Sequence, residues 1–268
     1  MKVSALQMTS GPDVAANLAV AGELLRQAAD TGATLALLPE NFAFMGLKDA
    51  DKLAVGEAPG NGPIQDALAQ LASRLSLWIV AGTMPLKRPG SAKVAAASLV
   101  FDAEGRQRAR YDKIHLFDVD LPERGEVYRE STHIEPGREP VVIDSPLGRL
   151  GLSVCYDMRF PELYRELAAR GAQVLLMPAA FTVPTGEAHW EVLLRARAVE
   201  NQCYVVAAAQ WGRHASGRET WGDSMVVDFW GRVLARSPAG VGVVTAGIDL
   251  GALDGVRKSF PALRHRVL

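Results

Sequence analysis

The sequence predicts an α/β fold in which two sheets pack face to face between outer helices, a four-layer α-β-β-α sandwich. Three observations support this prediction. Short apolar strands alternate with helical patterns along the chain. Segment 32–42 matches segment 171–181 at five of eleven positions, and segment 98–110 matches segment 224–236 at seven of thirteen. Because the matches recur in the same order, we expect two pseudo-repeated halves whose sheets cover each other.

The first half is expected to start with a strand at 2–8 and a helix that begins at Asp13 and stops at Gly32, a favoured C-cap residue. Residues 117–140 are polar, contain Pro and Gly and show no periodicity, so they are expected to form a long loop. The other elements expected in this half are a strand at 35–38, a helix at 63–75, and strands at 78–82, 97–101 and 106–111.

The second half repeats this order. Pro161 suits the first turn of a helix at 161–170, which Gly171 would close. The remaining elements are a helix at 187–200, a short helix at 251–259, and strands at 149–155, 174–177, 203–209, 224–228, 232–236 and 241–248. Since each half alone leaves one sheet face uncovered, we expect residues 1–268 to form a single domain. The alternative is one continuous doubly wound sheet.

Composition narrows the class of protein. The 268 residues are 49% apolar and 22% charged, as in ordinary globular proteins. A net charge of −1 provides no basic surface for nucleic acid or membranes. Two cysteines suit a reducing compartment, and the first residues lack a signal-peptide pattern. No apolar run approaches the ~20 residues that span a bilayer. We therefore expect a cytoplasmic protein that binds neither nucleic acid nor membranes.

Three reactive side chains occur at expected strand ends, each in only one half. Glu40 aligns with Ala179 and Lys113 with Ala239, while Cys155 has no thiol counterpart in the first half. Ligands of α/β sheets bind at such strand ends. Cys155 also precedes a helix, whose N-terminal amides can lower a thiol pKa. The other thiol, in the apolar strand 203–209, is expected in the core.

Other chemistries are weighed against this cluster. A papain-type Cys–His hydrolase stays open because His115 lies two residues from Lys113 and the fold could bring a histidine to Cys155. The sequence has no H-E-x-x-H motif, no paired cysteines, no P-loop, and no G-x-G-x-x-G after a strand. We therefore expect no metal and no cofactor. A non-catalytic binding module is the remaining alternative.

Segments 38–41, 111–118 and 155–163 resemble motifs of the nitrilase (carbon–nitrogen hydrolase) superfamily, and more narrowly its Nit branch. The resemblance runs nearly end to end. It implies the sandwich fold and an amidase that works through a cysteine thioester and releases a carboxylic acid, with water as the second substrate. It also implies a homodimer or a higher homo-oligomer.

The resemblance further assigns the site residues. Glu40, Lys113 and Cys155 would form the catalytic triad. The segment 129–131 matches the context of the family's second glutamate, which makes Glu130 the candidate that holds Lys113. The backbone N–H of Tyr156 would bind the oxyanion together with the Lys113 ammonium.

Within the Nit branch, segment 204–214 is more similar to enzymes that hydrolyse deaminated glutathione than to the ω-amidases, which act on α-ketoglutaramate. The ω-amidases tend to carry Ser-Pro-Ala-Arg where this chain has Ala-Gln-Trp-Gly. The implied substrate is a small dicarboxylic 2-oxo amide, whose free carboxylate needs a cation. Glu187 replaces a usual Pro near the site entrance. The substrate-binding candidates are Arg159, Phe181 and Arg195; Arg197 is a further possible clamp, and ion pairs with Glu191 or Glu200 are the alternative for the last two arginines.

Overall fold

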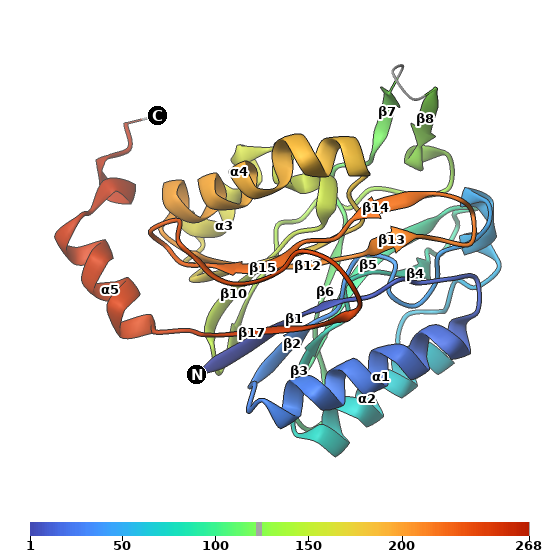
Figure 1. Ribbon diagram of the computed structural model, residues 1–268, viewed down its shortest axis with the longest axis horizontal. Helices are drawn as coiled ribbons and strands as arrows, with labels where there is room; N and C mark the ends of the chain where they lie inside the picture. The colour runs from blue at the N-terminus through green and yellow to red at the C-terminus, as the bar shows by residue number, and fades with distance from the viewer. Residues whose placement is uncertain (122–124, 268) are drawn as a thin grey trace.

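The computed structural model describes residues 1–121 and 125–267. Two sheets pack face to face in its centre, and helices cover the outer face of each (Figure 1). The expected four-layer α-β-β-α sandwich is confirmed, and the alternative of one continuous sheet is wrong. None of the helices in the described ranges is long and apolar enough to cross a membrane.

The first sheet has the strand order β17-β1-β2-β3-β5-β4, with β6 paired to β5. Helices α1 (Val14–Asp30) and α2 (Pro63–Leu75) cover it, and α1 begins where the Asp13 carboxylate accepts a hydrogen bond from the Ala16 N–H at 3.1 Å. Its strands are β1 (Lys2–Gln7), β2 (Leu35–Leu37), β3 (Trp78–Val80), β4 (Met84–Lys87), β5 (Val94–Phe101), β6 (Gln107–Asp112) and β17 (Gly242–Gly247).

The second sheet has the strand order β16-β15-β12-β11-β10-β9 and is covered by α3 (Pro161–Ala169) and α4 (Val183–Asn201). The inner faces of the sheets meet where β1 packs on β12 and β15. Its strands are β9 (Val142–Ser145), β10 (Gly148–Leu152), β11 (Val174–Ala179), β12 (Tyr204–Ala209), β15 (Ser224–Val227) and β16 (Val233–Ser237).

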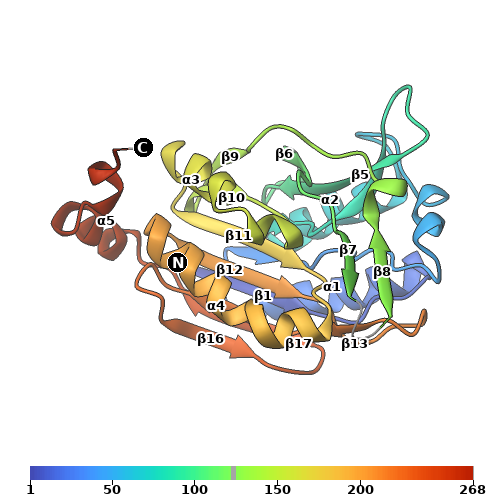
Figure 2. The ribbon, with the colours of Figure 1, turned by 90° about the horizontal axis from the view of Figure 1, so that it is seen from above.

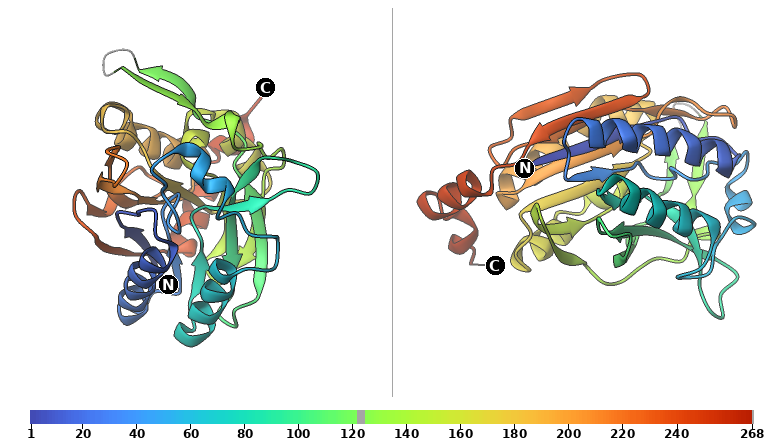
Figure 3. Two further views of the ribbon diagram at one scale, coloured as in Figure 1. Left: turned by 90° about the vertical axis from the view of Figure 1, so that its right-hand side faces the viewer. Right: turned by 90° about the horizontal axis from the view of Figure 1, so that it is seen from below.

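The internal repeat extends to hydrogen bonds. In the turn between β5 and β6, Asp102 Oδ1 accepts bonds from two backbone N–H groups, and Asp228 Oδ1 does the same between β15 and β16. Both turns contain a glycine at positive φ, Gly105 at 81° and Gly231 at 82°. The halves are also interlocked, because β17 comes from the second half yet pairs antiparallel with β1 of the first sheet (Figure 3).

The prediction of a long loop at 117–140 is wrong. It contains the antiparallel strands β7 (Asp118–Leu121) and β8 (Glu126–Arg129), whose hairpin projects beyond the sheets, and the short 3-10 helix Glu130–Thr132 (Figures 1 and 3). Strands β4 and β9 and the hairpin of β13 (Trp211–Arg213) and β14 (Glu219–Trp221) were not expected either. Short or polar strands carry little hydrophobic alternation, which explains the omission. Helix α5 (Leu250–Ser259), which follows β17, lies beyond one end of the sheets (Figure 2).

At Gly82 the turn after β3 lies very close to the backbone of the segment between β2 and Glu40. Its φ is +41°, and a Cβ added there would lie 1.9 Å from the Pro39 carbonyl oxygen. Gly82→Ala is therefore expected to lower the free energy of unfolding by well over the ~1 kcal/mol that an incompatible backbone angle alone costs. Gly90→Ala is the matched control, with φ +77° and open space around the new Cβ. Chemical denaturation of both variants checks this, and equal destabilisation would contradict it.

Candidate active site

One pocket receives the three reactive side chains that follow strands of both halves. Glu40 comes after β2, Lys113 directly after β6, and Cys155 three residues after β10. All three line the pocket and are buried, with exposed fractions of 4%, 2% and 7%. The sheets pack so that these strand ends meet at the same edge of the sandwich.

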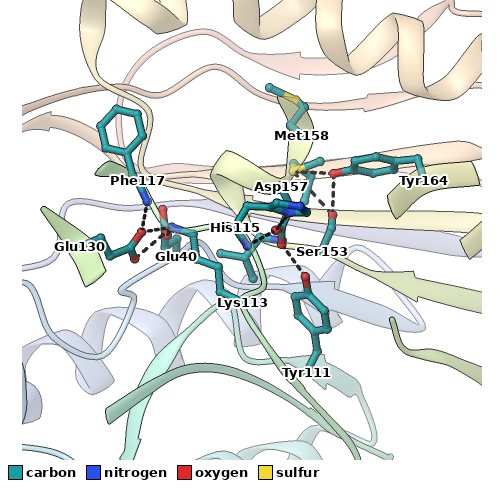
Figure 4. A network of polar contacts seen from close by, with 12 residues as sticks. Glu40, Tyr111, Lys113, His115, Phe117, Glu130, Ser153, Asp157, Met158 and Tyr164 are labelled. Atoms are coloured by element: carbon teal, nitrogen blue, oxygen red, sulfur yellow. Dashed lines mark hydrogen bonds and ion pairs between the residues drawn. The ribbon is translucent and has the colours of Figure 1, made fainter. Parts of the chain in front are cut away.

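A hydrogen-bonded chain of charges joins them. Lys113 Nζ donates to Glu40 Oε1 at 2.8 Å and to Glu130 Oε2 at 2.8 Å (Figure 4). The Cys155 thiol is hydrogen-bonded to Glu40, whose second oxygen accepts the Ala180 N–H at 2.9 Å. Glu130 is held in turn by the Phe117 N–H at 2.7 Å. The structure thus brings Glu130 to Lys113, the contact that the family resemblance implies.

The surroundings of Glu40, Lys113 and Cys155 shift their pKa values and so determine which of the three is charged. Burial alone would raise the pKa of Glu40, but the Lys113 charge and hydrogen bonds from Cys155 and Lys113 outweigh it, so the pKa is lowered. Burial would lower the pKa of Lys113, yet Glu130 and Glu40 hold it well above its usual value. Burial and the Glu40 charge raise the pKa of the Cys155 thiol well above its usual range. The resting site is therefore a thiol beside a carboxylate and an ammonium.

Cys155 lies in a strained elbow rather than at a strand end, which corrects the expected strand at 149–155. It begins the 3-10 helix Cys155–Arg159, and its φ is +48°. Such angles cost of order 1–3 kcal/mol for a residue other than glycine and persist only where neighbours enforce them. Here the enforcing neighbour is Asp157, whose Oδ2 accepts the Val154 N–H at 2.8 Å and the Tyr111 hydroxyl at 2.6 Å.

Asp157 also fixes the segment that carries Lys113. Its Oδ1 accepts the His115 N–H at 3.0 Å and meets His115 Nδ1 at 2.8 Å (Figure 4). One fully buried carboxylate therefore joins the thiol elbow to the residues beside the ammonium. His115 itself does not border the pocket and stacks on Phe160 with ring centroids 3.7 Å apart.

One backbone donor and one buried side-chain amide complete the surroundings of the triad. Tyr156 lines the pocket, and its N–H has no acceptor among the described residues. Gln210 Nε2 donates to the Glu40 carbonyl oxygen at 3.0 Å and to Ser10 Oγ at 2.7 Å, so it fixes the backbone of the carboxylate. Gln210 belongs to the segment that separates the chain from the ω-amidases in sequence.

Two of the three substrate-binding candidates border the pocket. The Arg159 guanidinium lies over the rings of Phe181 and Tyr156, 5.4 and 5.8 Å from their centroids. Phe181 is buried and forms the wall beside it. Arg159 Nη1 also meets His189 Nδ1 at 3.3 Å.

The third candidate, Arg195, lies outside the pocket, so that expectation is not met. It faces outward on α4, where it donates to the Gly231 carbonyl oxygen at 2.8 Å and pairs with Glu191 at 3.4 Å. Arg197 pairs with Glu200 at 2.7 Å, which leaves the ion-pair alternative correct for both arginines. Glu187 is exposed and borders the same outer hollow as Arg195, not the pocket.

Cys203 lies in the core, as expected. Its thiol contacts the carbonyl oxygens of Ala172 and Asn201 at 3.2 Å each, and burial raises its pKa to about 12. A thiol of this kind is unreactive at neutral pH. Within the described residues, no three His, Cys, Asp or Glu side chains gather as a metal site would require.

Among the pocket side chains that sequence reasoning missed, Arg218 and Tyr128 form a contact of their own. Arg218, in the turn between β13 and β14, donates to the Ala180 carbonyl oxygen at 2.9 Å, and its guanidinium lies 5.2 Å from the centroid of the Tyr128 ring. Tyr128 belongs to the β7–β8 hairpin. Both lie in polar hairpins without a motif, and only tertiary structure brings them to Cys155.

The chain is similar to known proteins over nearly its whole length. The model of the family described as carbon-nitrogen hydrolase matches residues 2–258. Deaminated glutathione amidase from Yersinia enterocolitica is 44% identical over 264 residues, which cover 98% of this chain and 92% of that protein.

Solved structures agree in fold. Caenorhabditis elegans NitFhit superposes with a TM-score of 0.92 at 41% identity; the match covers 99% of this chain and 65% of that longer one. Saccharomyces cerevisiae Nit3, a member of branch 10 of the nitrilase superfamily, has a TM-score of 0.90 at 30% identity and coverages of 100% and 97%. A mutant amidase from Nesterenkonia sp. AN1, with acrylamide added at its active-site cysteine, has a TM-score of 0.79 at 28% identity and coverages of 97% and 98%.

Proposed function

Because the chain belongs to the carbon–nitrogen hydrolase family of the nitrilase superfamily and is an amide-hydrolysing enzyme, we propose that its substrate is deaminated glutathione. In this compound an oxo group replaces the amino group of glutathione. The amide to be cleaved joins a 2-oxoglutaryl group to the amino group of cysteinylglycine. Hydrolysis releases 2-oxoglutarate and the dipeptide.

The first half of the proposed reaction forms a thioester. Cys155 Sγ attacks the amide carbon while its proton passes to Glu40, which is hydrogen-bonded to the thiol and ionised. The Lys113 ammonium and the free Tyr156 N–H bind the oxyanion that develops. Glu40 then gives its proton to the leaving nitrogen, the C–N bond breaks and the amine departs. General acid–base action of this kind contributes about 10²–10⁴-fold in rate.

The second half returns the enzyme to its resting state. A water molecule takes the place of the amine beside Glu40, which removes its proton as the oxygen attacks the thioester. The C–S bond breaks, the carboxylic acid leaves, and Sγ recovers its proton from Glu40. Glu130 keeps Lys113 charged and oriented throughout through its two contacts of 2.8 and 3.0 Å.

The observation that carries this proposal is the buried cluster of thiol, carboxylate and ammonium at one edge of the sandwich. A nearly full-length relative at 44% identity that is named for deaminated glutathione supports the choice of substrate. The second candidate is the ω-amidase reaction, in which α-ketoglutaramate releases ammonia. Both substrates yield 2-oxoglutarate, so one assay of that product compares their kcat/KM values. A higher value for α-ketoglutaramate would reverse the proposal.

Single substitutions of His115 and of Glu40 distinguish the triad from a papain-type site. His115→Ala should retain kcat within about tenfold, because its ring binds Asp157 and stacks on Phe160 away from the thiol. Glu40→Gln should lower kcat by about 10²–10⁴-fold, since it removes the carboxylate that is bonded to the thiol. Steady-state assays of 2-oxoglutarate release check both. The opposite pattern would support a Cys–His hydrolase.

Three further expectations remain part of this proposal. A single domain over residues 1–268 is supported by β17, which ties the second half into the first sheet. A homodimer or higher homo-oligomer is supported by exposed apolar side chains of the outer α4 region and the segments beside it, namely Val192, Val199, Trp230 and Phe260. A cytoplasmic location is supported by the two unpaired thiols.

A further inference from the structure

Two guanidinium groups on the pocket wall have no carboxylate partner among the described residues. Arg159 meets two aromatic rings and His189, and Arg218 meets one ring and a carbonyl oxygen. Both side chains are partly buried, and a guanidinium at a binding surface commonly binds a carboxylate or phosphate. The pocket is therefore prepared for anionic groups at two separate places.

Arg218 lies on the Glu40 side of the pocket. Its Nη2 donates to the carbonyl oxygen of Ala180, and the N–H of the same residue donates to Glu40 Oε2, both at 2.9 Å. The Arg218 charge is one of those that lower the pKa of Glu40. Its Nε is buried and has no hydrogen-bond acceptor in the described part of the chain. The guanidinium is thus fixed in position with donors to spare.

The pocket extends on this side. A second hollow adjoins it and shares several lining residues with it, Arg218 among them. Lys48 and Lys52 add positive charge there, against one acidic residue, Asp49. On the Arg159 side, Phe181 and Tyr156 form the wall. Space and positive charge for a group larger than ammonia therefore lie beyond Arg218. The residues shared by the two hollows are Asn41, Asp49, Lys52, Tyr128 and Arg218.

We propose that Arg218 binds a carboxylate carried by the leaving amine and thereby selects amides of carboxylated amines, such as dipeptides, over primary amides. This inference rests on the proposed function, in which Glu40 protonates the leaving nitrogen, so that the leaving group lies on the Glu40 side. Arg159 remains for the carboxylate of the acyl part. Deaminated glutathione has one carboxylate at each end, and the two guanidinium groups match them.

Three substrates that share the 2-oxoglutaryl group separate these roles. They are deaminated glutathione, its C-terminal glycinamide, which lacks the charge on the leaving group, and α-ketoglutaramate, which lacks the dipeptide. Arg218→Met keeps an unbranched side chain against Tyr128 and removes the charge. Arg213→Met is the matched control, because Arg213 lies on the same hairpin but is exposed and does not line the pocket. Arg218→Gln can still donate to the Ala180 carbonyl oxygen, and serves if the methionine variant melts early.

Wild type should cleave deaminated glutathione with about 10–100-fold higher kcat/KM than the glycinamide, as a charge-assisted hydrogen bond predicts. Arg218→Met should remove that preference: its kcat/KM should fall about 10–100-fold further for deaminated glutathione than for the other two substrates. Any loss shared by all three substrates reports the Arg218 charge near Glu40. Arg213→Met should keep the wild-type preference. An equal loss on all three substrates, or no loss, would overturn the inference. If the wild type cleaves deaminated glutathione and its glycinamide equally well, the inference about Arg218 is wrong while the proposed function stands. A wild type that cleaves neither defeats the proposed function and this inference with it.

Discussion

Cys155→Ala is expected to fold normally and to lose amide hydrolysis by more than about 10⁴-fold. The substitution removes only Sγ from a small buried site, and alanine meets the same positive φ of +48° that cysteine already tolerates. Without the thiol no thioester can form. Lys113 and Tyr156 can then stabilise only a direct attack by water, which Glu40 alone is poorly placed to assist.

The other cysteine is the matched control for that variant. Cys203→Ala removes a thiol that is likewise buried, but whose polar contacts are with two carbonyl oxygens and Arg257 and not with the triad. It should keep kcat within about threefold and lose about 1 kcal/mol of unfolding free energy, as for a small buried group. Circular dichroism and 2-oxoglutarate release measure both variants. Turnover near the wild-type rate in Cys155→Ala would refute the mechanism.

Lys113→Met should lower kcat by about 10²–10³-fold, as loss of one oxyanion donor does in other acyl-transfer sites. It should also lower the free energy of unfolding by about 3–5 kcal/mol, because it leaves Glu40 and Glu130 without their shared cation in a buried site. The double variant Lys113→Met/Glu130→Gln should regain part of the stability but none of the activity. A single variant with kcat within tenfold of wild type would contradict the role of Lys113.

Lys113→Met should also reverse the way in which the Glu40 contribution to the free energy of unfolding depends on pH. In the wild type Lys113 lowers the pKa of Glu40, so this carboxylate contributes stability above its unfolded pKa, and the contribution is lost as the pH falls through the folded pKa. Without Lys113, burial dominates and raises the folded pKa above the unfolded one. The variant should then gain stability as the pH falls toward the pKa of a free glutamate. Denaturation at several pH values measures both trends.

The repeat and the strand ends made most of the fold and the reactive cluster predictable. The turn residues Asp102 and Asp228 recur in sequence because each accepts the same backbone hydrogen bonds in its hairpin. Glu40 and Lys113 occur only in the first half and Cys155 only in the second. Residues with a structural role tend to recur in both halves of a repeat. Reactive residues that occur in only one half therefore indicated a functional site.

Contacts made only in the folded chain escaped prediction. Arg218 is remote in sequence from its neighbours Ala180 and Tyr128, and the hairpins that bring them together are polar and short. Arg159 and Arg195 are both arginines near helices of the second half, and their sequence contexts do not show that only the first faces the pocket. The left-handed angle of Cys155 depends on Asp157 and on its bonds to Tyr111 and His115.

In the proposed mechanism the acyl group of the amide passes through Cys155. Acid quenching of wild-type enzyme during turnover, followed by mass spectrometry of its peptides, tests it most directly. With deaminated glutathione and with α-ketoglutaramate, the peptide that contains Cys155 should carry the same 2-oxoglutaryl group, and Cys155→Ala should carry none. An acyl group on another residue such as Cys203, or steady release of 2-oxoglutarate from an enzyme that carries none, would contradict the account.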